Sequence, residues 1–325
     1  MDYKYLLLLI VINFLFIKFT KLISLKLKIF SKTIFQSKEV TKNISLIGGL
    51  LIIINFNFIY FFGNFSDHLM YKNLFNILII SNFFFIIGYL DDRYSFSPYL
   101  NFFIFLLVGY FLLKLFNVYL INSWKFGSHF ETINIEPYSL IFTLFSIFAF
   151  MNCLNMFDGI NGHSGIYTVF VMGVFYFFSS NEIFIYYILI ILFFLYFNLK
   201  NLFFLGNSGV SFLGSFISLT FIFLYNNLYI KFVEEIVFVM ILPGMDMIRL
   251  FFVRIINKKN PFIGDKNHWH HIISRKFGNT LTLVCTLIVS LIPFYIYEFL
   301  NVKINYVLLI FLIIYFSLLA ICKKY

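Results

Sequence analysis

The segment Ile183–Leu199 reads IFIYYILIILFFLYFNL and contains no charged side chain. A bilayer core of roughly 30 Å is crossed by about 20 apolar residues in an α-helix, so this segment predicts a membrane span. The whole chain has the same character, because 62% of its 325 residues are hydrophobic and only 12% are charged. This composition excludes a soluble globular enzyme, a disordered chain and a secreted disulfide scaffold.

Ten more segments are apolar enough to span, which predicts an all-α, polytopic integral membrane protein with about 10–11 transmembrane helices. The helices leave no room for a separate soluble domain, so residues 1–325 are expected to form a single transmembrane domain. The further expected spans are Leu6–Phe19, Ile44–Phe62, Asn73–Leu90, Tyr99–Leu120, Tyr138–Phe157, Gly165–Phe178, Val210–Leu228, Glu235–Ile255, Leu281–Leu300 and Tyr306–Ile321.

The orientation of the chain follows from its basic residues. The first span has no small-residue cleavage site and is followed by a lysine-rich stretch from Lys18 to Lys42, so it is expected to be an uncleaved anchor with its C-terminal end in the cytoplasm. The net charge of +10 is then an orientation signal, and no nucleic-acid partner is expected. The three cysteines are isolated, which favours neither disulfides nor a cysteine zinc site.

The acidic residues gather on the side already rich in cations. Five of the seven aspartates fall at expected cytoplasmic helix ends or loops. Helix capping explains about two of them, but it does not explain an adjacent pair together with a histidine cluster. We therefore expect an active site in a cleft that faces the cytoplasm. The five aspartates are Asp91, Asp92, Asp158, Asp246 and Asp265.

Two motifs indicate chemistry with phosphate or a divalent cation. Adjacent carboxylates such as Asp91 and Asp92 repel each other unless a cation is near, which favours a metal or a metal-bound diphosphate. Asn152, Asn155 and Asp158 are three residues apart, so one helix face carries their oxygen atoms. Carboxylate and amide oxygens are suitable ligands for Mg²⁺.

Two further motifs lie closer to the C-terminus. Gly206–Gly214 is rich in glycine and serine and could either pack helices or approach a ligand. The second motif, which contains Asp265, His268, His270 and His271, could bind zinc, recognise phosphate and sugar oxygens, or be a solvated basic loop. We favour recognition of a polar substrate, because no second ligand cluster accompanies the histidines.

The order of these motifs resembles the polyprenyl-phosphate N-acetylhexosamine-1-phosphate transferases over about residues 38–278. The motifs are DD, N-x-x-N-x-x-DG-x-x-G, G-x-x-G-x-S-x-LG, P-x-x-D and PF-x-x-D-x-x-H-x-HH. The HWHH segment, His268–His271, is similar to the corresponding segment of the branch that acts on undecaprenyl phosphate and UDP-GlcNAc. It differs from that of the peptidoglycan branch. The resemblance implies a multi-pass enzyme of the bacterial inner membrane that transfers a HexNAc-1-phosphate from a UDP-HexNAc to undecaprenyl phosphate and releases UMP.

The resemblance also implies a Mg²⁺ cofactor, with Mn²⁺ as the alternative, a surrounding membrane lipid phase, a homodimer, and a product that initiates O-antigen, capsule or other envelope glycan synthesis. By the same resemblance, Asp91, Asp92 and Asp158 are the expected catalytic residues, and Asn155, Asn207 and Asp158 the expected metal ligands. The expected substrate-binding residues are Lys42, Asn152, Asp265, His268, His270 and His271.

The chain departs from the family pattern at several positions. Asn207 stands where the family has Asp, His163 where it has Leu, and Asn101 where a basic residue is frequent. Because an amide keeps an oxygen but loses the charge, one alternative is a weakened or inactive homologue that only binds. The other alternative is a transporter of lipid-linked sugars, although its ionisable groups would be expected near the middle of the membrane.

Overall fold

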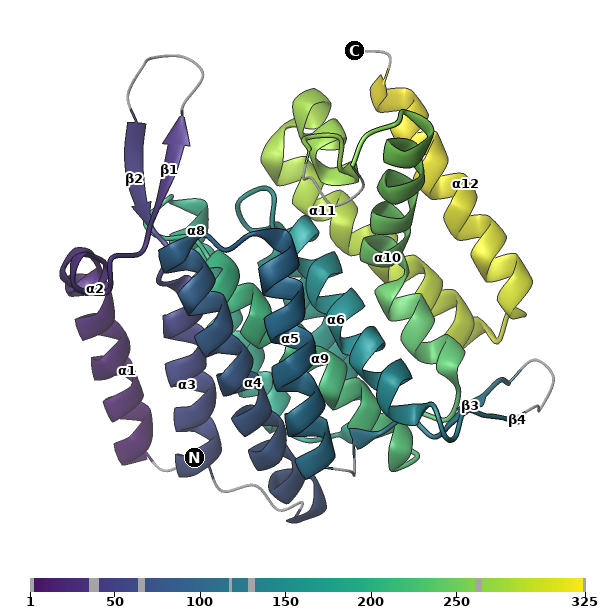
Figure 1. Ribbon diagram of the computed structural model, residues 1–325, viewed down its shortest axis with the longest axis horizontal. Coiled ribbons are helices and arrows are strands. Elements are labelled where there is room, and N and C mark those ends of the chain that lie inside the picture. Colours follow the sequence, from purple (N-terminus) through teal and green to yellow (C-terminus); the bar gives the residue numbers. More distant parts are fainter. Residues whose placement is uncertain are drawn as a thin grey trace.

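The computed structural model describes residues 3–34, 41–63, 68–116, 119–127, 132–260 and 265–323. Within these ranges the chain forms a bundle of helices that pack side by side (Figure 1). The helices are α1 Tyr3–Lys18, α2 Thr20–Leu27, α3 Gly48–Phe62, α4 His68–Tyr94, α5 Pro98–Leu115, α6 Ser139–Phe157, α7 His163–Ser179, α8 Ile183–Leu199, α9 Gly206–Asn226, α10 Val233–Ile256, α11 Trp269–Leu300 and α12 Ile304–Lys323.

The prediction of an all-α polytopic membrane protein is confirmed, and each of the expected spans overlaps a helix. Seven helices in the described ranges are long and apolar enough to cross a membrane, or eight if the bent pair α1–α2 is one span. Helices α3, α7 and α8 are apolar but shorter. Fewer helices therefore meet the length criterion than the 10–11 expected, because α3 has 15 residues and α7 and α8 have 17 each.

The residues before α3, 30–34 and 41–45, differ from the expectation. They form an antiparallel pair of strands, β1 Phe30–Ile34 and β2 Thr41–Ser45, where the sequence predicted a basic loop running into a span. Ser45 also pairs with Phe203, since the Phe204 N–H donates to the Ser45 carbonyl at 2.8 Å. A second short pair, β3 Ser123–Lys125 and β4 Thr132–Asn134, lies at the opposite end of the bundle (Figure 1).

Helix α9 is the centre of the bundle. It is buried along its length and packs against α3, α4, α6 and α7. A Cβ added at Gly49 would lie 2.4 Å from the Gly209 Cα, so α3 and α9 approach closely through small residues. The Gly48 N–H donates to the Phe204 carbonyl at 2.9 Å, and that of Gly49 to the Leu205 carbonyl at 3.0 Å. These contacts fix the position where α9 begins.

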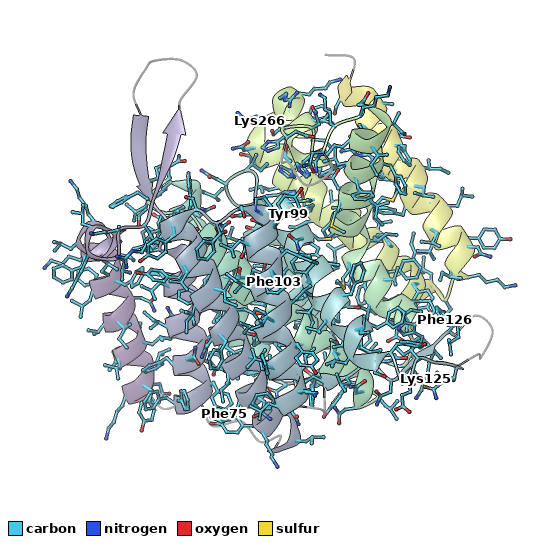
Figure 2. The ribbon with its side chains drawn as sticks, viewed as in Figure 1. Phe75, Tyr99, Phe103, Lys125, Phe126 and Lys266 are labelled. Atoms are coloured by element: carbon cyan, nitrogen blue, oxygen red, sulfur yellow. The ribbon has the colours of Figure 1, made fainter. Side chains whose placement is uncertain are left out.

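Helix α11 consists of two segments. Gly278 has φ 76° and ψ 169°, a backbone conformation that glycine adopts at least cost, and it separates residues 269–277 from the long apolar part. The apolar part agrees with the expected span Leu281–Leu300. The shorter part carries His270 and His271. Lys266, three residues before it, lies at the same end of the bundle as Tyr99 at the start of α5 (Figure 2).

Candidate active site

Asp91 and Asp92 lie in the last turn of α4 and face the beginning of α9. The Asp92 carboxylate accepts the N–H groups of Asn207 and Ser208 at 2.8 and 2.9 Å. The first backbone N–H groups of a helix have no partner within the helix and attract negative charge. Asp92 therefore caps α9 from a neighbouring helix, and this contact ties the carboxylate pair to the glycine-rich motif.

Asp91 is held by three donors. Its Oδ1 accepts the Phe96 N–H at 2.8 Å, and its Oδ2 accepts the side-chain amides of Asn207 at 2.9 Å and Asn101 at 3.3 Å. Asn207 thus donates its backbone to Asp92 and its side chain to Asp91. Neutral amide donors of this chain stabilise the adjacent carboxylates. The Asn207 Nδ2 is used in this way, which leaves its Oδ1 as the oxygen that could contact a ligand.

Asp158 follows the last residue of α6, and its Oδ1 accepts a short hydrogen bond from the Ser164 hydroxyl. Burial raises the pKa of the Asp158 carboxyl to about 7, the Ser164 hydrogen bond opposes this shift, and the charge of Asp92 adds to it. A carboxyl with this pKa gains or loses a proton near neutral pH, and a nearby cation would favour its charged form.

A cavity of about 440 Å³ joins these motifs. Its polar lining comes from the ends of α4, α6 and α8, the loop after α6, and the start of α9. Asp92 and Asp158 are the carboxylates among the described residues that line it. The polar residues that line it are Asp92, Asn155, Asp158, Asn161, Asn198 and Asn207.

Asn198 was not selected from the sequence. It is 4% exposed, its Oδ1 accepts the Gly162 N–H at 2.7 Å, and its Nδ2 donates to the Phe203 carbonyl at 3.1 Å. Asn198 therefore holds the loop after α6 against the strand-like segment before α9. The sequence contains a signal for Asn198, because a polar amide inside an apolar membrane helix is costly unless it has hydrogen-bond partners.

None of the expected substrate-binding residues is among the described residues that line the cavity. Asn152 is half-buried and its Nδ2 donates to the Phe148 carbonyl one turn earlier, at 2.9 Å. Asp265 accepts Arg254 Nε at 2.9 Å and the Asn267 N–H at 2.7 Å. Burial opposes ionisation of Asp265, but these hydrogen bonds outweigh it and lower its pKa. The backbone of Lys42 belongs to β2, whereas its side chain lies outside the described residues.

The histidines form a buried group behind the loop that follows Asp158. His268 Nδ1 lies 2.9 Å from an oxygen of Asp246, and His270 has no exposed surface. A Cβ added at Gly159 would lie 2.2 Å from His270 Nε2 and 2.7 Å from His271 Nε2. His270 and His271 therefore lie directly against the backbone of the Asp158 loop, and His271 keeps part of its surface exposed.

Asp246 organises the same group from α10. Its Oδ1 accepts the Trp269 N–H at 3.0 Å, the Tyr315 hydroxyl at 2.9 Å and Arg249 at 2.7 Å, so it fixes the start of α11. His163 also joins the group, because its Nδ1 lies 2.6 Å from the Phe157 carbonyl and its ring centroid 4.5 Å from that of His270. His163 links the Asp158 loop to α11.

Zinc was one alternative for the histidine motif. In the part of the chain that the structure describes, no three His, Cys, Asp or Glu side chains are grouped so that they could hold a metal ion. The histidines and Asp246 instead form hydrogen bonds and ring contacts with one another. These contacts indicate a structural role for the histidines, which support the loop that lines the cavity.

The contact between α4 and α9 gives a testable consequence for Gly88. A Cβ at this position would lie 2.4 Å from the Asn207 carbonyl oxygen and 2.7 Å from the Ser208 Cα, and neither backbone atom can move freely. Gly88→Ala is expected to destabilise the protein by about 1–3 kcal/mol, as overpacking generally does. It should also lower turnover, because Asp92 loses its alignment with the two N–H groups. Thermal unfolding in detergent and turnover measure the two effects.

Gly173→Ala is the matched control, since no atom lies within 4 Å of a Cβ at this position in α7. Its effect on stability should be small or favourable, by about 0.5–1 kcal/mol. Wild-type stability and turnover in Gly88→Ala would show that the close approach does not matter.

The fold and the cavity define a class: a multi-pass membrane protein with a polar, carboxylate-lined site at one end of its bundle. The sequence matches the model of glycosyl transferase family 4 over residues 74–225. It is 26% identical over 330 aligned residues to the undecaprenyl-phosphate alpha-N-acetylglucosaminyl 1-phosphate transferase of Escherichia coli O157:H7, which covers 95% of this chain and 88% of that protein. The chain is therefore similar to members of glycosyl transferase family 4.

Two more relatives carry the same name. The Yersinia pestis protein is 27% identical over 58% of this chain and 55% of its own length. The Thermotoga maritima protein is 34% identical over 27% of this chain and 29% of its own length. The family match from 74 to 225 contains Asp91, Asp92, Asp158 and Asn207, and it includes every described residue that lines the cavity except Leu46.

Proposed function

We propose that this protein transfers a HexNAc-1-phosphate from a UDP-HexNAc to undecaprenyl phosphate, giving undecaprenyl-diphosphate-HexNAc and UMP. The observation that carries the proposal is that Asp92 of α4, Asp158 after α6 and the first turn of α9 meet at one cavity. Two carboxylates and amide oxygens suit a metal-bound diphosphate. The names of the relatives give undecaprenyl phosphate and an N-acetylglucosaminyl 1-phosphate group.

The residues of the cavity fit a magnesium ion, with manganese as the alternative. Mg²⁺ is commonly held by one or two carboxylates, with water and substrate phosphate oxygens completing its coordination. Asp92 and Asp158 would supply the carboxylates, and Asn155 and the Asn207 Oδ1 the amide oxygens. When bound, the ion neutralises charge on the diphosphate during transfer.

The two adjacent aspartates have different roles in this proposal. Asp92 lines the cavity and is the group that orients the acceptor phosphate. Asp91, held by Phe96, Asn101 and Asn207, keeps Asn207 in place. Little base catalysis is needed, because a phosphate monoester with a second pKa near 6 is largely dianionic at about pH 7. Catalysis then consists mainly of positioning and charge stabilisation.

The histidines are proposed to act on the polar cavity through the loop that follows Asp158, because His270 and His271 lie against that loop. His271 is partly exposed and lies beside Gly159, so it is the histidine that we propose as a contact for the sugar nucleotide. The buried His268 and His270 position the loop that carries Asp158. Lys42 and Asp265 belong to neighbouring segments. Lys42 is proposed to contribute positive charge, and Asp265 to keep the segment before α11 ordered.

The polyprenyl chain requires an apolar surface beside this site. A second cavity of about 380 Å³ lies between α6, α9 and α10, and its walls are largely apolar. Phe150 and Cys153 on α6 line it, and Asn155, two residues beyond Cys153, lines the polar cavity. We propose that this surface accommodates part of the undecaprenyl tail. The end of the bundle with the polar cavity would face the cytoplasm of a bacterial inner membrane, and the product would initiate an O-antigen, capsule or related glycan.

The purified full-length chain tests the proposal directly. With undecaprenyl phosphate and Mg²⁺, a panel of UDP-HexNAc donors should give UMP and a lipid-linked product with at least one donor. Absence of EDTA-sensitive UMP release with every donor would contradict the proposal. Uptake of lipid-linked sugar into proteoliposomes without chemical conversion would instead favour the transporter alternative.

The raised pKa of Asp158 predicts how activity depends on metal and pH. Below about pH 7 the carboxyl is mainly protonated, so a cation must displace its proton, whereas above that pH the proton is already lost. Chelation should abolish turnover and Mg²⁺ should restore it. The Mg²⁺ concentration for half-maximal UMP release should fall as the pH rises from about 6 to 8, by up to about tenfold per unit below the pKa. A constant requirement over this range would contradict the assignment of Asp158.

A further inference from the structure

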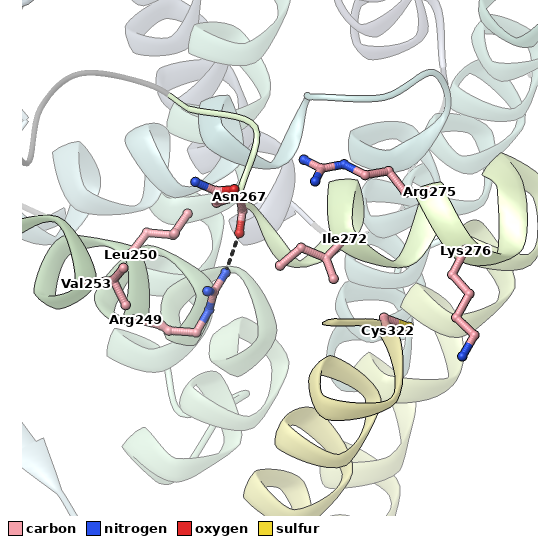
Figure 3. Close-up of a pocket in the computed structure, with 8 residues that line it drawn as sticks. All are labelled: Arg249, Leu250, Val253, Asn267, Ile272, Arg275, Lys276 and Cys322. Carbon is pink, nitrogen blue, oxygen red and sulfur yellow. Dashed lines mark hydrogen bonds between the residues drawn. The ribbon is translucent and has the colours of Figure 1, made fainter. Parts of the chain in front are cut away.

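A separate pocket of about 340 Å³ lies between α10, the segment before α11, the short part of α11 and the end of α12. Figure 3 shows three of its basic side chains, Arg249 on α10 and Arg275 and Lys276 on α11. None of the residues that line it lines the polar cavity. The pocket lies on another side of the histidine segment. None of the expected site residues lines it, and it has no part in the proposed reaction.

The described residues that line this pocket include three cationic side chains and no carboxylate. Arg249 is paired with Asp246 at 2.7 Å, and it also donates to the Asn267 carbonyl at 2.8 Å (Figure 3). Arg275 forms a short hydrogen bond with the Lys266 carbonyl, and no carboxylate of the described chain forms an ion pair with it. Lys276 Nζ donates to the Ile321 carbonyl at 3.0 Å. No carboxylate lines the pocket within the described residues.

The remaining wall is apolar and opens toward the lipid-facing surface. Leu250, Val253, Ile272 and Cys322 line it. Val253 is 39% exposed, and its neighbour Phe252 is 57% exposed. Arg249 lies seven residues before the end of α10, roughly 10 Å along the helix at 1.5 Å per residue. The pocket therefore lies near the membrane boundary, where a polar headgroup meets acyl chains.

We propose that this pocket binds the headgroup phosphate of an anionic glycerophospholipid. Basic pockets between membrane helices are suited to such headgroups, because cations pair with the phosphate while the apolar wall contacts the glycerol and acyl carbons. Arg275 presents planar, paired donors that match phosphate oxygens. A bound lipid would join α10, α11 and α12 at the end of the bundle that holds the histidines. The proposal does not depend on the sugar-transfer reaction.

Retention of lipid by the purified full chain tests this proposal. We expect the wild-type protein to bind phosphatidylglycerol in nanodiscs or by native mass spectrometry, and to bind phosphatidylcholine much more weakly. Arg275→Gln combined with Lys276→Gln should weaken phosphatidylglycerol binding about 30-fold, because two cations are lost. Lys231→Gln with Lys303→Gln, at the opposite end of the bundle, removes the same charge and should leave binding unchanged.

A charge-preserving pair, Arg275→Lys with Lys276→Arg, separates binding from folding and should retain most of the affinity. Binding of phosphatidylglycerol that differs less than twofold between the wild type and the Gln pair would overturn the proposal. Equal binding of phosphatidylcholine would also overturn it, as would displacement of the lipid by millimolar inorganic phosphate. Retention of undecaprenyl phosphate alone would assign the pocket to the acceptor substrate and exclude a glycerophospholipid.

Discussion

Asp158→Asn and Asp92→Asn are each expected to lower kcat by about 1,000-fold or more while the protein remains folded. Both carboxylates line the polar cavity, and their negative charge is what would hold the cation on the diphosphate. Asparagine preserves the size of the side chain but removes that charge. The Asp92 change should also weaken the capping of α9, so its effect on thermal unfolding should exceed that of Asp158→Asn.

Glu182→Gln is the matched control for these substitutions, since it also converts a carboxylate into an amide. Glu182 is exposed at the N-cap of α8, at the end of that helix away from Asn198 and the cavity. Initial rates of UMP release and thermal unfolding should be measured for all three variants. If Asp158→Asn and Asp92→Asn both retain rates close to that of Glu182→Gln, the assigned roles are wrong.

Asn207→Asp is expected to lower activity rather than raise it. The Asn207 amide donates to Asp91, so aspartate at this position would place a carboxylate against another carboxylate about 3 Å away, next to Asp92. We expect kcat/KM to fall about tenfold or more at limiting Mg²⁺. Saturating Mg²⁺ should recover part of the loss, because the cation offsets the repulsion. Asn207 would then be an adaptation of this site and not a sign of its decay.

A second substitution tests the same argument by restoring the balance of charge. Asn101 also donates to Asp91, at 3.3 Å, so Asn101→Lys places a cation beside the crowded carboxylates. The double variant Asn101→Lys/Asn207→Asp should be more active than Asn207→Asp alone. If Asn207→Asp alone exceeds the wild type at every Mg²⁺ concentration, the wild-type protein is the weakened homologue that the sequence left as an alternative.

The membrane helices were predictable because their signal is local. A run of apolar residues such as Ile183–Leu199 fixes a helix without reference to the rest of the chain. The association of the DD, N-x-x-N-x-x-DG and glycine-rich motifs was also predictable, since the orientation rule placed all three at the same membrane face. Their meeting at one cavity agrees with that expectation.

What could not be predicted depends on contacts between distant segments. The strands at 30–45 are fixed partly by the pairing of Ser45 with Phe203, which no local pattern reveals. The burial of His270 follows from the packing of α11 against the loop after Asp158. Likewise, the role of Asn207 becomes clear only when Asp91 and Asn101 are seen around it.

The most direct test follows the phosphate itself. A UDP-HexNAc donor labelled with ³²P at the phosphate attached to the sugar distinguishes transfer of the sugar phosphate from transfer of the sugar alone. The proposed reaction predicts that the label appears in the lipid fraction as UMP is released, and that Asp158→Asn abolishes this transfer. Label that remains on the nucleotide as UDP while the lipid acquires unlabelled sugar would contradict it.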